Sequence, residues 1–322
     1  MSHWLYQRFK AERKDWHPEY ALRNSIRWPI ALSHLCDKGQ FETHALKSFY
    51  LKQNRRPVNP SADNLVFDAV LMALHNLSAL TRIRENPNCY IDLVRSATIA
   101  WYYGVYHSAS AMIAAAQGER QESHAKTARA WGNQLVNRGA VVEPFCYSTT
   151  TLVKKGYESE IDMLKNGNEF SLNNFPEDDV TSFGGAISYL KGTANRSREK
   201  HEEIIKASND FNKLGCADFR KSIAKEFRDK RLSGKQTNFI DQAIRYRGKA
   251  NYRDSIYLSY GQDRSTWIAK LVPSLEVTLK CFLSMACQYA ERRVEKGVWE
   301  EFCDDLVEHC LFRIDADTVK GE

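Results

Sequence analysis

The fold is decided by the stretch Ser96-Ala-Thr-Ile-Ala-Trp-Tyr-Tyr-Gly-Val-Tyr-His-Ser-Ala-Ser-Ala-Met-Ile113. Apolar residues recur through it, and through its flanks, at alternating spacings of three and four, which is typical of a helix with one face against a core. The stripe consists of Ile91, Val94, Thr98, Trp101, Val105, Ala109 and Met112. A second face carries only small residues, namely Gly104, Ser108, Ala111 and Ala115. The pattern predicts a helix over 90–116 that a neighbouring helix, in the same chain or in a second copy, approaches closely.

The overall composition also favours long helices. The chain has 322 residues with only 8 prolines and 16 glycines, and few turn residues disfavour a β architecture. The 8 cysteines stand singly and the N-terminus has no apolar leader, so we expect reduced thiols in a cytoplasmic protein. Residues 96–117 lack Lys, Arg, Asp and Glu, but their serines and alanines indicate a buried core helix, and we expect no membrane contact.

Other segments extend this all-α prediction. Helices are expected near 61–85, 238–247 and 266–294, the last with a kink at Pro273, and Ser61 or Asp63 is expected to cap the first. Its apolar side is expected to comprise Leu65, Ala69, Met72 and Leu77. We interpret residues 55–60 as a linker because two prolines prevent a helix there. Residues 140–195 combine β-prone runs with Asn, Gly and Pro, which predicts irregular structure or a short hairpin. A basic helical pattern then runs over 197–231.

Four segments, in order, carry a resemblance to a known family. The 96–113 stretch resembles the aromatic- and alanine-rich second helix of HEPN-superfamily proteins, and Glu122-Ser-His-Ala-Lys126 is similar to the connection after it. Ile244-Arg-Tyr-Arg-Gly-Lys-Ala-Asn-Tyr252 is similar to the third-helix motif, and the helix ending near Val294 to the last helix. The resemblance covers 64–135 and 236–295. It implies a HEPN-like helical bundle in halves 61–139 and 236–295, with an N-terminal helical extension over 1–60, an insertion over 140–235 and an acidic tail over 296–322.

The third-helix motif bears on catalysis. In catalytic members an Arg is followed after four residues by His and, one residue later, by Tyr; here Arg245 and Tyr252 match, but Ala250 replaces the His. An alanine cannot carry a proton, so this motif should be inactive, while Arg245 retains the ability to hold a phosphate. The resemblance therefore implies a non-catalytic nucleic-acid-binding or scaffold subunit of a prokaryotic stress or phage-defence assembly. It also implies a homodimer or another protein subunit as partner, and no cofactor.

An alternative is a HEPN-type, metal-independent ribonuclease whose catalytic residues are displaced. The candidates are Arg95, His107, Arg120 and His124. The competing interpretation is a buried, hydrogen-bonded His107 and a surface His124. Arg27 and His34 have the loose family spacing, but Pro29 lies between them.

Two further clusters have ordinary explanations. Cysteines and a histidine late in the chain have spacings of six and seven, unlike a helical metal site, and we expect no metal; they are Cys281, Cys287, Cys303, His309 and Cys310. Nearby acids have consecutive helical spacing and indicate a solvated face: Glu300, Glu301, Asp304, Asp305 and Glu308.

Charge is unevenly distributed around a net +6. Residues 191–235 hold 13 Lys or Arg and 7 Asp or Glu, whereas 291–322 hold 5 and 10. A stripe of cations within the basic segment is suited to an RNA or DNA phosphate backbone: Arg220, Lys221, Lys225, Arg228 and Arg231. On a helix, Lys221, Lys225 and Arg228 should share one face. Salt bridges with Glu226 and Asp229 are the competing explanation.

Overall fold

A computed structural model describes residues 4–12, 18–165, 176–248, 260, 265–314 and 318–319. The fold is 74% helix with no strand among these residues, which confirms the all-α prediction. Elements that frame the longer helices are α1 (Trp4–Glu12), α3 (Thr43–Tyr50), η1 (Pro87–Cys89), α6 (His124–Gln134), η2 (Val136–Arg138), α11 (Phe239–Gly248) and α14 (Val298–His309).

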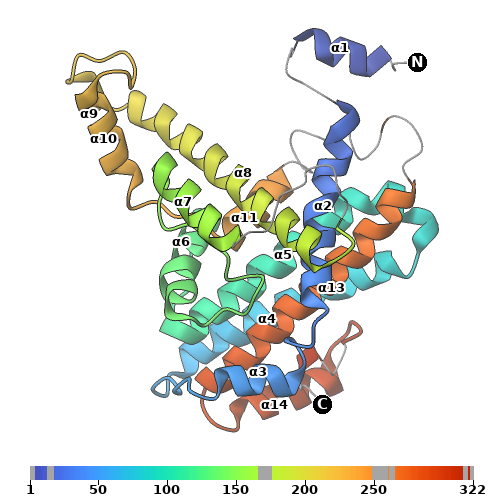
Figure 1. The fold of residues 1–322 in the computed structure, drawn as a ribbon. Coiled ribbons are helices and arrows are strands. Elements are labelled where there is room, and N and C mark those ends of the chain that lie inside the picture. The colour runs from blue at the N-terminus through green and yellow to red at the C-terminus, as the bar shows by residue number, and fades with distance from the viewer. Residues whose placement is uncertain are drawn as a thin grey trace.

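The main body is built around α5 (Tyr90–Gln117), which packs along α4 (Pro60–Arg84) and α13 (Ser265–Arg293) (Figure 1). α2 (Pro18–Cys36) lies against α13, which continues through Pro273. A Cβ on Gly104 would come within 2.5 Å of Leu279 Cδ2. The small-residue face of α5 therefore serves close contact with α13 of the same chain.

Most of the expected apolar stripe of α5 is buried, but two predicted core residues are not. Ile91 is 48% exposed, because the first turn of α5 packs on its neighbours through Tyr90 and Val94 instead. Met72 of α4 is 41% exposed, because α4 packs through Ala69, Ala73 and Leu77. By length and composition alone α4 is also apolar enough to cross a membrane, a test that buried core helices pass as well.

The 55–60 segment is fixed to the body. Asn59, not Ser61 or Asp63, caps α4, because its Oδ1 accepts from the Ala62 N–H at 3.1 Å and Pro60 opens the helix. Asp63 is buried and paired with Arg56 instead. The Arg56 guanidinium also donates to Ala114 O at 2.8 Å, and Arg293 donates to Ala115 O and Ala116 O at 3.3 and 3.1 Å. These arginines satisfy the carbonyls at the C-terminal end of α5.

The prediction of irregular or β structure over 140–195 is wrong for most of that range. α7 (Lys154–Lys165) and α8 (Asp179–Lys206) are helices; 166–175 lie outside the described residues. Thr149 and Thr237 form an isolated antiparallel bridge, and Val141, Val142 and Phe145 are buried in the core, so their β-prone character reflects burial of a loop. Gly184 and Gly185 do not break α8; Gly185 lies where its Cβ would be 3.2 Å from Ala31 of α2.

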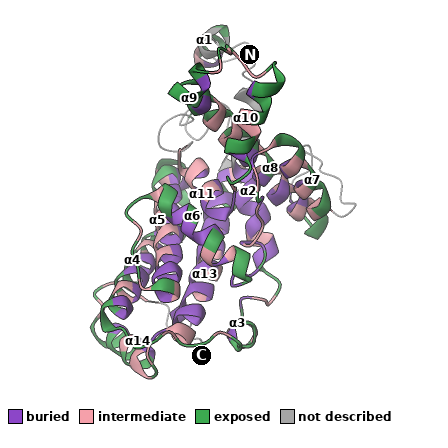
Figure 2. Ribbon diagram, turned by 90° about the vertical axis from the view of Figure 1, so that its left-hand side faces the viewer, coloured by how far each residue is buried: buried purple, intermediate pink, exposed green. Residues whose placement is uncertain are grey.

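Residues 191–235 form a projection that we call the arm (Figure 1). It consists of the C-terminal half of α8, α9 (Asn209–Asn212) and α10 (Ser222–Leu232), so the helical pattern expected over 197–231 is divided among three helices. A small separate core holds it against α7; its members are Leu152, Tyr157, Ala194, Ile205, Phe211, Ala224 and Leu232. Figure 2 shows the purple, buried residues concentrated in the body, while α9 and α10 stand away from it.

Candidate functional site

One group of aromatic, histidine and arginine side chains comes together where α5, α6 and α11 meet, three helices that pack on one another (Figure 2). We call it the histidine–arginine site. It contains Tyr102, Tyr106, His107, Arg120, His124 and Arg247. The structure thus brings together three of the four residues proposed for a displaced catalytic site and adds Arg247, which sequence reasoning missed. The remaining candidate, Arg95, is exposed on α5 two turns before Tyr102, outside this group.

His124 is held at both ring nitrogens. Its Nδ1 lies 2.8 Å from Tyr102 Oη and its Nε2 lies 3.4 Å from Arg247 Nη1. Because a guanidinium can only donate, Nε2 must be the acceptor, and Nδ1 carries the hydrogen that is donated to Tyr102. The Arg247 Cζ also lies 4.5 Å from the centre of the Tyr102 ring. These contacts select one neutral tautomer of His124.

His107 lies on the other side of Tyr106. The Tyr106 ring centre is 5.3 Å from that of His107 and 4.5 Å from that of His124. Tyr106 and His107 line a small pocket together with Asp68 and Arg120, whose side chains pair at 3.6 Å. The result is a row of partly exposed rings with an arginine near each end.

Both histidines are biased toward the neutral form. Burial, and then the charge of Arg247, lower the pKa of His124. Burial and the charge of Arg120 lower the pKa of His107, opposed by Asp68. A neutral imidazole can accept a proton, and an arginine can stabilise negative charge on a nearby phosphate. The site therefore contains the groups that metal-independent acid–base chemistry requires.

Arg245, the family-motif arginine, points to the arm instead of this site. Its Nη1 donates to Thr193 Oγ1 at 3.0 Å, and its Cζ lies 4.9 Å from the centre of the Tyr189 ring. A Cβ at Gly192 would come 3.1 Å from the same guanidinium nitrogen. Arg245 thus contacts α8, while Ala250 and Tyr252 lie outside the described residues.

The expected cationic stripe on the arm is divided between paired and unpaired side chains. Arg228 is only 18% exposed and pairs with Glu202 and Asp229 at 3.5 and 2.8 Å, so it does not share an exposed face with Lys221 and Lys225. Further internal pairs join Arg231 to Asp210 at 2.6 Å and Arg220 to Asp218 at 3.2 Å.

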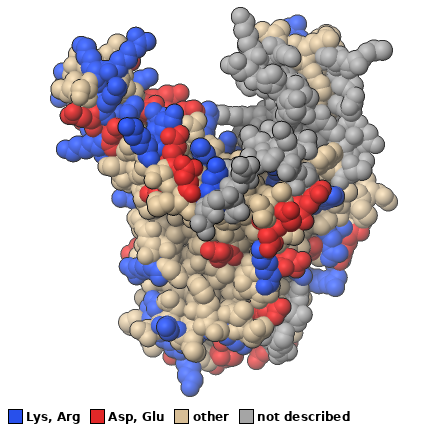
Figure 3. Space-filling model, in the orientation of Figure 1, with Lys and Arg blue, Asp and Glu red and all other residues tan. Residues whose placement is uncertain are grey.

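Several cations of the arm remain exposed, and no ion pair forms with them in the part of the chain that the structure describes. They are Lys191, Arg196, Lys200, Lys213, Lys221, Lys225, Lys230 and Lys235. In Figure 3 Lys and Arg gather on the arm. These side chains, and not the arginines of the predicted stripe, are the available phosphate-binding groups.

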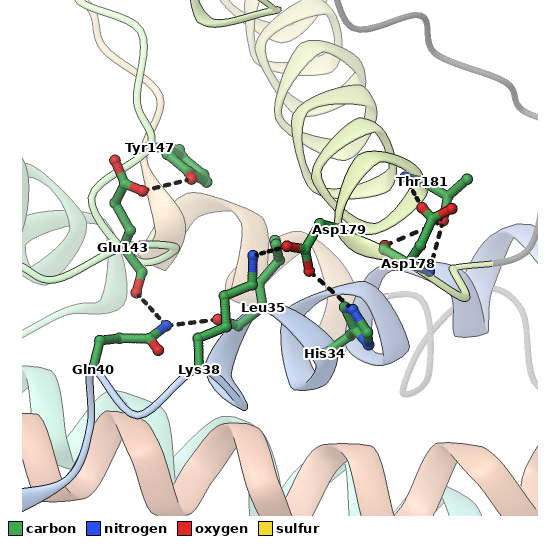
Figure 4. A network of polar contacts seen from close by, with 9 residues as sticks. All are labelled: His34, Leu35, Lys38, Gln40, Glu143, Tyr147, Asp178, Asp179 and Thr181. Atoms are coloured by element: carbon green, nitrogen blue, oxygen red, sulfur yellow. Dashed lines mark hydrogen bonds and ion pairs between the residues drawn. The ribbon is translucent and has the colours of Figure 1, made fainter.

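His34 takes part in a structural network. Its Nε2 and the Lys38 Nζ lie 3.2 and 2.8 Å from opposite oxygens of Asp179, next to the Asp178 cap of α8 (Figure 4). Gln40 extends the network by donating to Leu35 O at 2.6 Å and Glu143 O at 3.4 Å. The network ties the end of α2 to the start of α8, and Arg27 is buried nearby in the same helix.

The late cysteines and acids are spread over two helices. Cys287 is buried in α13 and Cys303 in α14. Within the described ranges no group of three or more His, Cys, Asp or Glu side chains is placed to hold a metal ion. The acidic residues of α14 lie on its exposed side, opposite Trp299, Cys303 and Leu306.

No protein-family model, curated protein or solved structure matches this chain.

Proposed function

We propose that the protein is a non-catalytic, HEPN-like nucleic-acid-binding subunit that contacts an RNA or DNA phosphate backbone through its arm. The observation that carries this proposal is the set of exposed arm cations that form no ion pair with any residue the structure describes. The HEPN-like part is supported by the helices α4, α5, α11 and α13, which occupy the ranges that the resemblance assigns to the bundle.

The arm is suited to binding the phosphate backbone of a nucleic acid and not to reading base edges. Its cations are mostly lysines, which bind phosphate as point charges without bidentate geometry. Each neutralised phosphate releases counterions, so binding should weaken steeply with salt and depend little on sequence.

The test reverses charge at the arm tip. Lys213, Lys221 and Lys225 are replaced together by Glu, and binding to a fluorescent RNA and DNA is measured by anisotropy over a salt series. We expect at least a tenfold loss of affinity at low salt and a salt slope smaller by about three, since each lost phosphate contact removes about one unit. Arg228 is left intact because it stabilises the arm through Glu202 and Asp229.

A matched control carries the same number of reversals at the other end of the molecule. Lys47, Lys52 and Lys296 are exposed near α3 and α14 (Figure 1). Their replacement by Glu should leave affinity within about twofold of the parent. If both triple variants bind equally well, the arm is a solvated surface and the proposal fails.

The gathering of His107, His124 and Arg120 favours a second candidate, a metal-independent ribonuclease. RNA would be incubated with the protein in excess chelator. Cleavage that is lost in His107→Ala or His124→Ala, but retained in Arg245→Ala, would support it. Intact RNA at long times with the parent protein would exclude it and leave the non-catalytic proposal.

A further inference from the structure

Arg247 is a half-buried cation without a counter-charge. In the part of the chain that the structure describes, no carboxylate pairs with it, and its buried Nε makes no hydrogen bond. Its contacts with the described residues are with His124 Nε2 and the ring face of Tyr102, neither of which carries a negative charge. Taking a charge out of water is costly unless an opposite charge compensates it.

The surroundings of Arg247 do not supply that compensation. Asp68, which lines the small pocket beside the histidine–arginine site, pairs with Arg120 on the far side of Tyr106 and His107. Burial raises the pKa of the Tyr102 hydroxyl, and burial and the charge of Arg247 lower the pKa of His124, so the neutral forms of both groups are favoured. The six side chains of the site therefore include two arginines and no carboxylate, and Arg247 has a donor that is unused among the described residues.

We infer that Arg247 and His124 bind the phosphate group of a nucleotide. A guanidinium offers parallel N–H donors that match phosphate oxygens, and His124 becomes a further donor when it takes up a proton at Nε2. The adjacent partly exposed rings of Tyr106 and His107 provide a surface on which a base stacks. Arg120, at the opposite end of the row, is the second cation of the site.

This inference is separate from the arm. Arg247 lies on α11, and the arm cations lie on α8 and α10 and in the segments that flank α9 and α10. The ligand comes either as a free mononucleotide or as the terminal phosphate of a strand, since both present the same chemistry.

Calorimetric titrations with adenosine monophosphate, adenosine, and a short RNA with or without a terminal 5′ phosphate distinguish these sources. We expect phosphate-bearing probes to bind and adenosine to bind at least tenfold more weakly. If the monophosphate binds and the 5′ phosphate does not increase the affinity for the RNA, the ligand is a free nucleotide. If the 5′ phosphate increases the affinity for the RNA and the monophosphate does not bind, the ligand is a strand end. Adenosine binding as tightly as the monophosphate, or no binding of either phosphate probe, overturns the inference.

Arg247→Gln tests the residue itself, with Arg129→Gln as control because Arg129 is exposed on the neighbouring helix α6. The first should lose at least tenfold in affinity for the phosphate-bearing probe and the second none. If Arg247→Gln fails to fold, Arg247→Lys replaces it; lysine keeps the charge but lacks the fork, so weakened, phosphate-dependent binding is expected. Equal binding by parent and Arg247 variant overturns the inference. The arm triple variant should bind mononucleotide normally, so failure here and failure of the arm proposal are distinguishable.

Discussion

At the residue scale, the arrangement around His124 shows how local charge sets protonation. The same guanidinium that orients the imidazole also disfavours its charged form. His107, Arg120 and His124 are recognisable in the sequence because they follow one another closely within and just after one predicted helix. Arg247 was not predicted, because the resemblance pointed to Arg245, two residues earlier. The two side chains lie on different sides of α11, so that Arg245 contacts Thr193 of α8 and Arg247 contacts Tyr102 of α5.

The lowered histidine pKa values predict how stability responds to acid. Unfolded, both histidines titrate near 6.5; folded, both hold their protons less tightly. Between pH 7 and 5 the unfolded state therefore binds more protons, and the free energy of unfolding should fall as pH drops below about 6.5. The groups that face the pair are Arg247, Arg120 and Asp68.

Urea denaturation across this range measures the effect. A double variant with His107→Asn and His124→Asn should show a shallower loss of stability between pH 7 and 5 than the parent. Identical slopes for the two proteins would mean that the histidines are not responsible.

At the element scale, the contact between α5 and α13 predicts the cost of adding a single methyl group. Because a Cβ on Gly104 would meet two Leu279 methyl carbons at 2.5 and 2.7 Å, Gly104→Ala should destabilise the fold by about 1–3 kcal/mol. Thermal unfolding measures it. Gly234→Ala is the control, since nothing lies within 4 Å of its added Cβ, and it should change stability by less than about 0.5 kcal/mol. Equal losses in both variants would contradict the packing argument.

The elements that sequence predicted best are those whose apolar period is set by the core. α5 and α13 begin and end within a few residues of expectation. The first part of α8 was missed because its first two turns contain a Thr-Ser pair, Gly184 and Gly185, which locally favour turns; contact with α2 stabilises the helix against those preferences. The capping residue of α4 was missed because Asn59 caps the helix, while Asp63 pairs with Arg56 through a tertiary contact that the sequence pattern does not reveal.

At the scale of the whole molecule, charge is separated between the basic arm and the acidic face of α14, which lie at opposite ends (Figure 1). Such a distribution would draw an anionic strand to one end. The distribution of charge along the sequence predicted this separation. It did not predict that several arm arginines form internal ion pairs, because partners such as Glu202 and Arg228 meet only through tertiary packing.

The homodimer stays a prediction, and it now needs a surface other than the small-residue face of α5. That face is occupied by α13. Sedimentation at micromolar concentration should give twice the monomer mass. A single species at the monomer mass would contradict the prediction.

The separate small core of the arm has a consequence for hydrogen exchange. The arm's buried set is far smaller than that of the body, and Arg245 of α11 contacts the arm at Thr193. Amides in α9 and α10 should therefore exchange through a sub-global opening of lower free energy than the opening that exposes α5, so that the arm forms a cooperative unit of its own. A bound strand that bridges the arm's cations would slow that opening without altering exchange in the body.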